Sequence, residues 1–272
     1  MKEIYQKTLS KKVSFKGIGL HSGKCAKVDI LPAEANKGIV FKRVDLIKNN
    51  LIKANYKNVS SAKLCTTLEN RYGIKVSTVE HLLAAFYIAG IDNALVEINN
   101  EEVPIMDGSS KDFVEGIYNT GIDEQTVVKN TFNIEKKIDL KIDNKFISLE
   151  PNDNGLVVDF KLNYKNDIIG NQRNVINFND KELKDVYTSR TFCLFEDIEK
   201  IKKLGFAKGG SLDNAIVVKE NEILNIGGLR NKLEFVNHKI LDLVGDFLLS
   251  GYRINGKVTT IEGGHNLSIS FL

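Results

Sequence analysis

The spacing of hydrophobic residues changes along the first half of the chain. Residues 25–30 alternate between polar and apolar side chains, which is the period of a strand with one buried face. From Thr78, a predicted N-cap, the apolar positions fall on one helical face until Gly90. A strand is predicted over 94–98, and a second helix over 109–121. The first half is therefore predicted to contain strands followed by two helices.

The second half repeats this order after the polar residues 123–125, which we interpret as a linker. The predicted strands cover 138–142, 146–149, 158–162, 258–261 and 267–271, and the predicted helices cover 195–204 and 233–249. Val-Glu-His at 79–81 is echoed by Val-Asn-His at 236–238. We predict an α+β fold of two similar domains, 1–124 and 125–272, each a mainly antiparallel sheet packed on two helices.

Composition excludes several classes of protein. The 272 residues include 38 Lys and Arg against 35 Asp and Glu, which gives a net charge of +3, and 42% of them are apolar. This balance does not fit a disordered chain, and it is too weakly basic to indicate a nucleic-acid partner. No apolar run approaches the roughly 20 residues that span a bilayer, and the first residues lack the apolar region of a secretory signal. We expect a cytoplasmic protein with no integral membrane segment.

The three cysteines, Cys25, Cys65 and Cys193, lie far apart and show no Cys-x-x-Cys spacing. A disulfide framework or a structural cysteine–zinc site is therefore not expected, and reduced thiols fit the cytoplasm. Cys65, beside Leu64, is predicted either to line an apolar pocket or to fill the core.

The most informative pair for chemistry is His238 and Asp242 in the longest predicted helix. They are four residues apart, so their side chains project from one face and can meet one ion. Asp246 extends this row by one more turn, where a carboxylate can orient a ligand or a catalytic histidine. The alternative for the pair is a hydrogen bond on the helix surface.

Glu80 and His81 lie at the start of the other long predicted helix, and with His238 and Asp242 they could form a metal site. His81 can supply a third ligand, while Glu80 can face a bound water and act as general base. Two histidines and one aspartate leave a fourth position open, which suits a catalytic Zn²⁺; Fe²⁺ also accepts such ligands. Taken alone, His81 can be a core or cap histidine, and Glu80 a first-turn acid favoured by the helix dipole.

Two further residues leave alternatives open. His265, in a predicted turn, can protonate a leaving amine or lie on the surface as a turn histidine. Thr191, in Ser-Arg-Thr-Phe, can donate to an oxyanion or cap a helix. The glycines of 17–23 predict a tight turn with a structural His21. The glycine-rich segment 206–211 matches no nucleotide-phosphate motif.

An ordered set of motifs then resembles one family. These motifs are Thr78-Val-Glu-His-Leu82, Pro104-Ile-Met-Asp-Gly-Ser109, Ser189-Arg-Thr-Phe192, Gly209-Gly-Ser211, Phe235-Val-Asn-His-Lys-Ile-Leu-Asp242 with Gly245-Asp246, and Gly264-His265. Together they resemble the UDP-3-O-acyl-N-acetylglucosamine deacetylases, the LpxC family of zinc amidases. The resemblance spans nearly the whole chain. Phe206 and Asn237 stand where Leu and Arg are more often expected.

The resemblance implies a role for each matching residue. The implied zinc ligands are His81, His238 and Asp242. The implied catalytic residues are Glu80 as base, Thr191 at the oxyanion, and His265, oriented by Asp246, as acid or electrostatic stabiliser. The candidate substrate contacts are Lys239, Phe192, Asp197, Leu20 and Cys65.

The resemblance also implies an architecture and a reaction. The active site would lie between the two domains, each of which carries an insert, and the second insert, near 192–215, would line a passage for an acyl chain. The reaction would be hydrolysis of the N-acetyl group of a UDP-linked, 3-O-acylated glucosamine, the committed step of lipid A synthesis, by a monomer. The alternatives are a zinc amidase acting on another acylated amino sugar and a non-catalytic acyl-sugar-binding protein.

Overall fold

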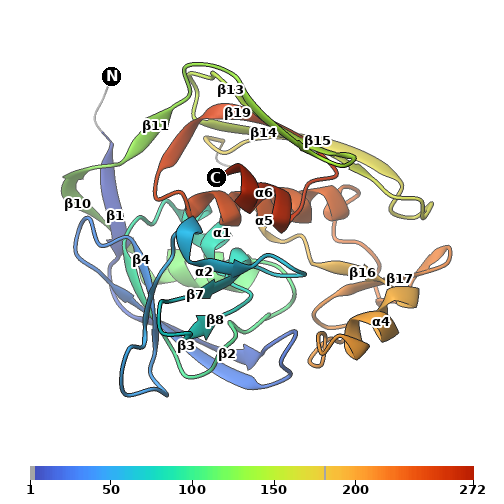
Figure 1. Ribbon diagram of the computed structural model, residues 1–272, viewed down its shortest axis with the longest axis horizontal. Coiled ribbons are helices and arrows are strands. Elements are labelled where there is room, and N and C mark those ends of the chain that lie inside the picture. The colour runs from blue at the N-terminus through green and yellow to red at the C-terminus, as the bar shows by residue number, and fades with distance from the viewer. Residues whose placement is uncertain (1–3, 181) are drawn as a thin grey trace.

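The computed structural model describes residues 4–180 and 182–272, with helices lying between two main sheets (Figure 1). An α+β fold with mainly antiparallel pairing is therefore confirmed. In the described part of the chain, every helix is too short or too polar to cross a membrane.

The first main sheet is built from the N-terminal half. Its spatial order is β2 (Val13–Ile18), β3 (Cys25–Pro32), β9 (Ala94–Ile98), β4 (Ile39–Arg43) and β5 (Leu51–Lys53). All neighbours pair antiparallel except β4 and β9, which are parallel. The alternation predicted in β3 and β9 is confirmed, because every second residue is buried in each strand.

The second main sheet has the same topology. Its order is β12 (Ile138–Ile142), β13 (Lys145–Glu150), β19 (Arg253–Ile261), β14 (Leu156–Asn163) and β15 (Asn171–Asn177), and the short β11 (Thr131–Asn133) also pairs with β19. Along this order all neighbours are again antiparallel except β14 and β19. In each main sheet the strand that comes last in the sequence, β9 or β19, lies in the middle. The two halves are therefore similar, as the Val-x-His echo suggested.

Each half also carries a small three-stranded sheet. The first contains β6 (Val59–Ser61), β7 (Thr67–Glu69) and β8 (Lys75–Val76), preceded by the 3-10 turn η1 (Tyr56–Asn58). The second contains β16 (Phe192–Leu194), β17 (Ile216–Lys219) and β18 (Glu222–Ile223), with η2 (Phe195–Asp197) and α4 (Ile198–Lys203) between its strands. The short helix α3 (Lys184–Tyr187) leads into it. The segment 192–215, which is predicted to be an insert, contains β16, η2 and α4 and ends just before β17.

The central helices hold the two halves together. Helix α1 (Glu80–Ala89) packs against α5 (Glu234–Leu248), and α2 (Lys111–Thr120) and α6 (His265–Phe271) pack beside them (Figure 1). Nearly every side chain of α1 and α5 is buried, because each helix has neighbours on all sides. One apolar core lies on the β2–β5 side and another on the β12–β15 side. The start of α1 therefore meets the middle of α5 at the centre of the molecule.

Three local predictions are wrong. Residues 123–125, predicted as a linker, lie in β10 (Ile122–Val128), which pairs with β1 (Tyr5–Leu9). Residues 267–271, predicted as a strand, belong to α6, because helical spacing lets Phe271 stack on Phe247 while Leu267 is buried. Thr78 does not cap α1, since its hydroxyl donates to Glu102. The predicted domain division at residue 124 stays a prediction.

Candidate metal centre and adjoining cavities

His81, His238 and Asp242 come together where α1 packs on α5. The Nε2 atom of each histidine lies 3.4 Å from Oδ1 of Asp242, and the three ligand atoms lie within 4.8 Å of one another. Ligand atoms placed tetrahedrally at zinc–ligand distances would be about 3.3–3.6 Å apart. Among the described residues, the buried Asp242 Oδ1 has no hydrogen-bond partner. The trio therefore has the spacing and the free oxygen that one small metal ion requires.

The protonation of these groups also suits a cation. His238 Nδ1 lies 3.1 Å from the carbonyl oxygen of Ser189, which can only accept, so Nδ1 carries the proton and Nε2 keeps its lone pair. Burial lowers the pKa of His238 to about 3. Burial alone would raise the pKa of Asp242, but His238 and Lys239 outweigh it and hold that pKa well below its usual range. A neutral imidazole and a charged carboxylate therefore face each other.

Two titratable groups lie beside this trio. Burial raises the pKa of Glu80, whose Oε2 accepts a hydrogen bond of 3.0 Å from the Thr66 backbone. His265 Nε2 is 3.9 Å from Glu80 Oε1, and its Nδ1 donates to Asp246 Oδ2 at 2.8 Å. Burial lowers the pKa of His265, but the carboxylates of Asp246, Asp242 and Glu80 outweigh it and raise that pKa to about 10. A carboxyl group that can accept a proton thus faces an imidazolium that can donate one.

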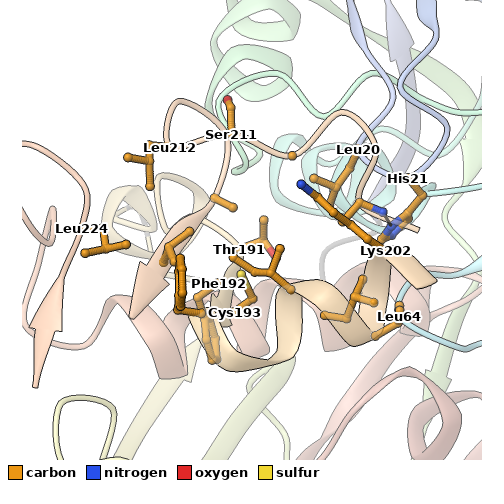
Figure 2. A pocket seen from close by; sticks show the side chains of 17 residues that line it. Leu20, His21, Leu64, Thr191, Phe192, Cys193, Lys202, Ser211, Leu212 and Leu224 are labelled. Atoms are coloured by element: carbon orange, nitrogen blue, oxygen red, sulfur yellow. Dashed lines mark hydrogen bonds between the residues drawn. The ribbon is translucent and has the colours of Figure 1, made fainter. Parts of the chain in front are cut away.

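Two cavities meet at this site. The metal cavity, of about 40 Å³, is lined by polar groups of the centre, among them Glu80, His81, His238, Lys239, Asp242 and His265. The apolar pocket, of about 360 Å³, is lined by residues of the second small sheet, η2 and α4, among others. Leu20, His21, Leu64 and Thr191 line both cavities. Figure 2 shows the apolar pocket, with Leu20, His21 and Leu64 at one end and Leu212 and Leu224 at the other.

Comparison with known proteins identifies the family. A family model described as UDP-3-O-acyl N-acetylglycosamine deacetylase, LpxC, matches residues 6–272. The chain belongs to the LpxC family. It is 40% identical to the UDP-3-O-acyl-N-acetylglucosamine deacetylases of Haemophilus ducreyi and Pseudoalteromonas translucida, in each case over 99% of this chain and 89% of the relative. The enzyme of the same name from Geotalea uraniireducens is 40% identical over 98% of this chain and 87% of its own length.

A third cavity, here called the lysine cavity, adjoins the metal centre of this LpxC-family chain at Lys239. It has a volume of about 380 Å³, and Lys145, Lys165 and Lys239 are among the residues that line it. Lys239 lines the metal cavity as well, and its Nζ lies 2.8 Å from Asp242 Oδ2 and 5.5 Å from the centre of the Phe192 ring. The metal cavity therefore shares residues both with the apolar pocket and, through Lys239, with a cavity lined by three lysines and Glu262.

The structure brings most of the predicted site residues of this LpxC-family chain together. Glu80, the three ligand candidates, Thr191, His265, Lys239 and Leu20 line the metal cavity, Phe192 lines the apolar pocket, and Asp246 holds His265. Asp197 lines neither of these two cavities and instead pairs with Lys200 at the surface. Cys65 is buried outside both lining sets, and burial raises the pKa of its thiol to about 12. We therefore find no cavity contact for the substrate roles predicted for Asp197 and Cys65.

Sequence reasoning missed several residues that support the site. Thr66 donates its hydroxyl to Asp246 at 2.6 Å and its backbone N–H to Glu80, so it holds both catalytic candidates. No spacing in the sequence links Thr66 to either partner. His21, predicted to be structural, lines both cavities, and its Nε2 is buried without a partner among the described residues.

A buried ion pair holds the segment that carries Ser189 and Thr191. The carboxylate of Glu234, at the first turn of α5, accepts from the backbone N–H of Arg190 and from its guanidinium at 2.7 and 3.1 Å. The Thr191 backbone N–H also donates to the Gly108 carbonyl at 2.7 Å. Arg190 was predicted only as part of a motif, and its partner lies on a distant element. This anchoring keeps the Ser189 carbonyl against His238.

Proposed function

We propose that this chain hydrolyses the N-acetyl group of UDP-3-O-acyl-N-acetylglucosamine and releases acetate, which is the committed step of lipid A biosynthesis. The observation that carries the proposal is the cluster of His81, His238 and Asp242 beside Glu80, in a chain that belongs to the LpxC family over nearly its whole length. We further propose that it works in the cytoplasm as a monomer.

The resident metal is proposed to be one Zn²⁺ held by His81, His238 and Asp242. The fit rests on the 3.4 Å spacings around the unpartnered Asp242 oxygen and on the neutral imidazole of His238. Zinc supplies Lewis acidity, which lowers the pKa of water to about 7 and polarises an amide carbonyl. Fe²⁺ accepts the same nitrogen and oxygen donors, so metal analysis must identify the ion.

The residues around the metal are proposed to move protons and stabilise charge. Glu80, whose pKa is raised by burial, takes the proton of the attacking water as the water oxygen bonds to the acetamide carbon. The Thr191 hydroxyl stabilises the oxyanion that develops on the former carbonyl oxygen. His265, kept protonated by Asp246, gives its proton to the nitrogen as the carbon–nitrogen bond breaks, so acetate and the free amine are the products.

The two larger cavities suit the two ends of the proposed substrate. The apolar pocket would take the 3-O-acyl chain, because Phe192, Ile198, Ile201, Val217 and Leu224 contribute apolar surface to it. The lysine cavity would take the diphosphate, because its three lysines, Lys145, Lys165 and Lys239, outnumber its one carboxylate, Glu262. Phe192 lines the apolar pocket and lies beside Lys239 of the lysine cavity, so the two cavities approach each other at this contact.

The test combines metal analysis with acetate release from the UDP-linked acyl sugar. The purified chain should contain about one zinc ion, as expected for three protein ligands and an open position. Chelation should abolish deacetylation, and added zinc should restore it. Full activity of the metal-free protein would overturn the mechanism.

A variant separates the base from the ligands. Glu80→Ala should keep its metal but lose about 10²- to 10⁴-fold in kcat, the usual contribution of a general base. Glu124→Ala, which changes an exposed carboxylate in β10, is the matched control and should be unaffected. Loss of zinc from Glu80→Ala would instead make Glu80 a ligand.

A further inference from the structure

Glu102 is a buried carboxylate that does not line the metal cavity but is hydrogen-bonded to His21 and Thr78, which do. Its side chain is 1% exposed, and it accepts hydrogen bonds from His21 N at 2.8 Å, Ser22 N at 2.7 Å and Thr78 Oγ1 at 2.9 Å. Among the described residues, no lysine or arginine forms an ion pair with it. Burying a carboxylate is unfavourable unless its hydrogen bonds are made, so the carboxylate and these three donors hold one another in place.

The first two donors belong to the turn 19–23, which forms a wall of both cavities. Leu20 and His21 line the metal cavity and the apolar pocket. Gly19 is required at the start of this turn, because a Cβ there would lie 2.3 Å from Glu102 Oε2. The backbone N–H groups of Lys208 and Gly209 donate to the carbonyls of His21 and Leu20, so the turn is also tied to segment 207–211, which lines the apolar pocket. Glu102 therefore anchors the wall that the two cavities share.

The third donor, Thr78, lies in the backbone segment that leads into α1. Thr78 has a φ of 56°, which is unfavourable for a β-branched residue and persists only where the surroundings enforce it. Its hydroxyl is held by Glu102, and the chain enters Glu80 and His81 two and three residues later. The same carboxylate thus constrains the backbone that presents the proposed base and one proposed ligand.

We propose that Glu102 is a positioning residue for the reaction, because its buried carboxylate aligns the Leu20–His21 wall with the Thr78 turn that precedes Glu80 and His81. This inference rests on the proposed deacetylase function. Glu102 contacts neither the substrate nor the metal in this role. It sets the relative placement of the chain's base and of the wall that guides the acyl chain.

The experiment compares Glu102→Gln with Glu101→Gln. The amide keeps the size of the side chain, but its NH₂ group would face an N–H or hydroxyl donor and break part of the cluster. Glu101 is the neighbouring residue, its side chain is half exposed, and it pairs with Lys24, so Glu101→Gln should keep activity within about twofold. Both variants are assayed for acetate release from two UDP-linked substrates, one with a long and one with a short 3-O-acyl chain.

Glu102→Gln should lose about 10- to 100-fold in kcat/KM on the long-chain substrate, and its preference for the long chain should shrink. A purely structural role would reduce both substrates equally, in proportion to the folded fraction measured by circular dichroism, and that result would overturn the proposal. Unchanged kinetics would overturn it as well. If the unsubstituted chain releases no acetate, the proposed function fails instead, and this control distinguishes the two failures.

A second variant covers the case in which Glu102→Gln does not fold. Gly19→Ala brings a methyl group against the same carboxylate and leaves Glu102 itself in place. It should reproduce the loss of long-chain preference. If Gly19→Ala folds and retains the full preference, Glu102 does not position the wall.

Discussion

The contact of α1 with α5 allows a sharp test of how closely the metal centre depends on helix packing. Gly245 of α5 faces the first turn of α1, and a Cβ at this position would lie 2.2 Å from the carbonyl oxygen of Glu80. Ordinary contacts begin near about 3.5 Å, so Gly245→Ala must push the two helices apart by about 1 Å. Because α1 carries His81 and α5 carries His238 and Asp242, this movement opens the metal centre.

The expected effects of Gly245→Ala are a loss of folding stability and a loss of function, and the two can be compared. Overpacking a well-packed contact costs about 1–3 kcal/mol, and the better helix propensity of alanine offsets about 1 kcal/mol of it. Stability should therefore fall by no more than about 2 kcal/mol. Displacing catalytic groups by about 1 Å costs about 10²-fold in rate, and disturbing the support of a metal site costs about 10- to 100-fold in affinity. The functional loss should thus exceed the loss of stability.

Gly116→Ala is the matched control for this test. Gly116 is also within a helix, α2, and a Cβ there would lie 2.6 Å from the Phe15 ring, away from the metal centre. Zinc affinity is measured by competition with a chelator, and stability by denaturant unfolding. Gly245→Ala should bind zinc at least tenfold more weakly than Gly116→Ala. Equal zinc affinities in the two variants would refute the reasoning.

Two further predictions follow from the buried charges. Burial lowers the pKa of His265 and the Asp246 carboxylate raises it, so Asp246→Asn should lower this pKa. Because the acid form of His265 is lost as pH rises through its pKa, the alkaline limb of the pH profile of kcat should move to lower pH. An alkaline limb that does not move would exclude His265 as the acid. Arg190→Met leaves Glu234 buried and unpaired, so the free energy of unfolding should fall by about 3–5 kcal/mol in denaturant titration. Lys200→Met, which breaks the exposed pair with Asp197, is the control and should cost less than about 1 kcal/mol; equal losses would contradict the prediction.

Much of the fold could be predicted from local hydrophobic patterns, because these patterns show which face of a strand or helix is buried. The alternation over 25–30 and 94–98 and the long helical stretch over 233–249 all correspond to elements of the structure. The same logic failed at 267–271, where a short alternating run is compatible with either period. There the contact of Phe271 with Phe247, which is not local, favours the helix.

Only part of the candidate site could be predicted from the sequence, because local patterns do not show contacts between distant segments. His238 and Asp242 are one helical turn apart, so local geometry alone places them together. Thr66 and Glu102 show no such spacing, because each meets its partners through packing between elements distant in the sequence. Glu234 likewise reaches Arg190 across the fold. Such residues act through hydrogen bonds that exist only after the elements have packed.

The sequence by itself determined the helix that pairs His238 with Asp242, the strands on either side, and the set of motifs that point to one family. Only the tertiary structure decided that His81 lies 3.4 Å from Asp242, that His265 is buried against Asp246, and that the apolar pocket and the lysine cavity adjoin one centre. The physical reason is the close packing of α1 on α5. Periodicity reveals which face of a helix is buried, but the partner of that face depends on contacts between distant segments.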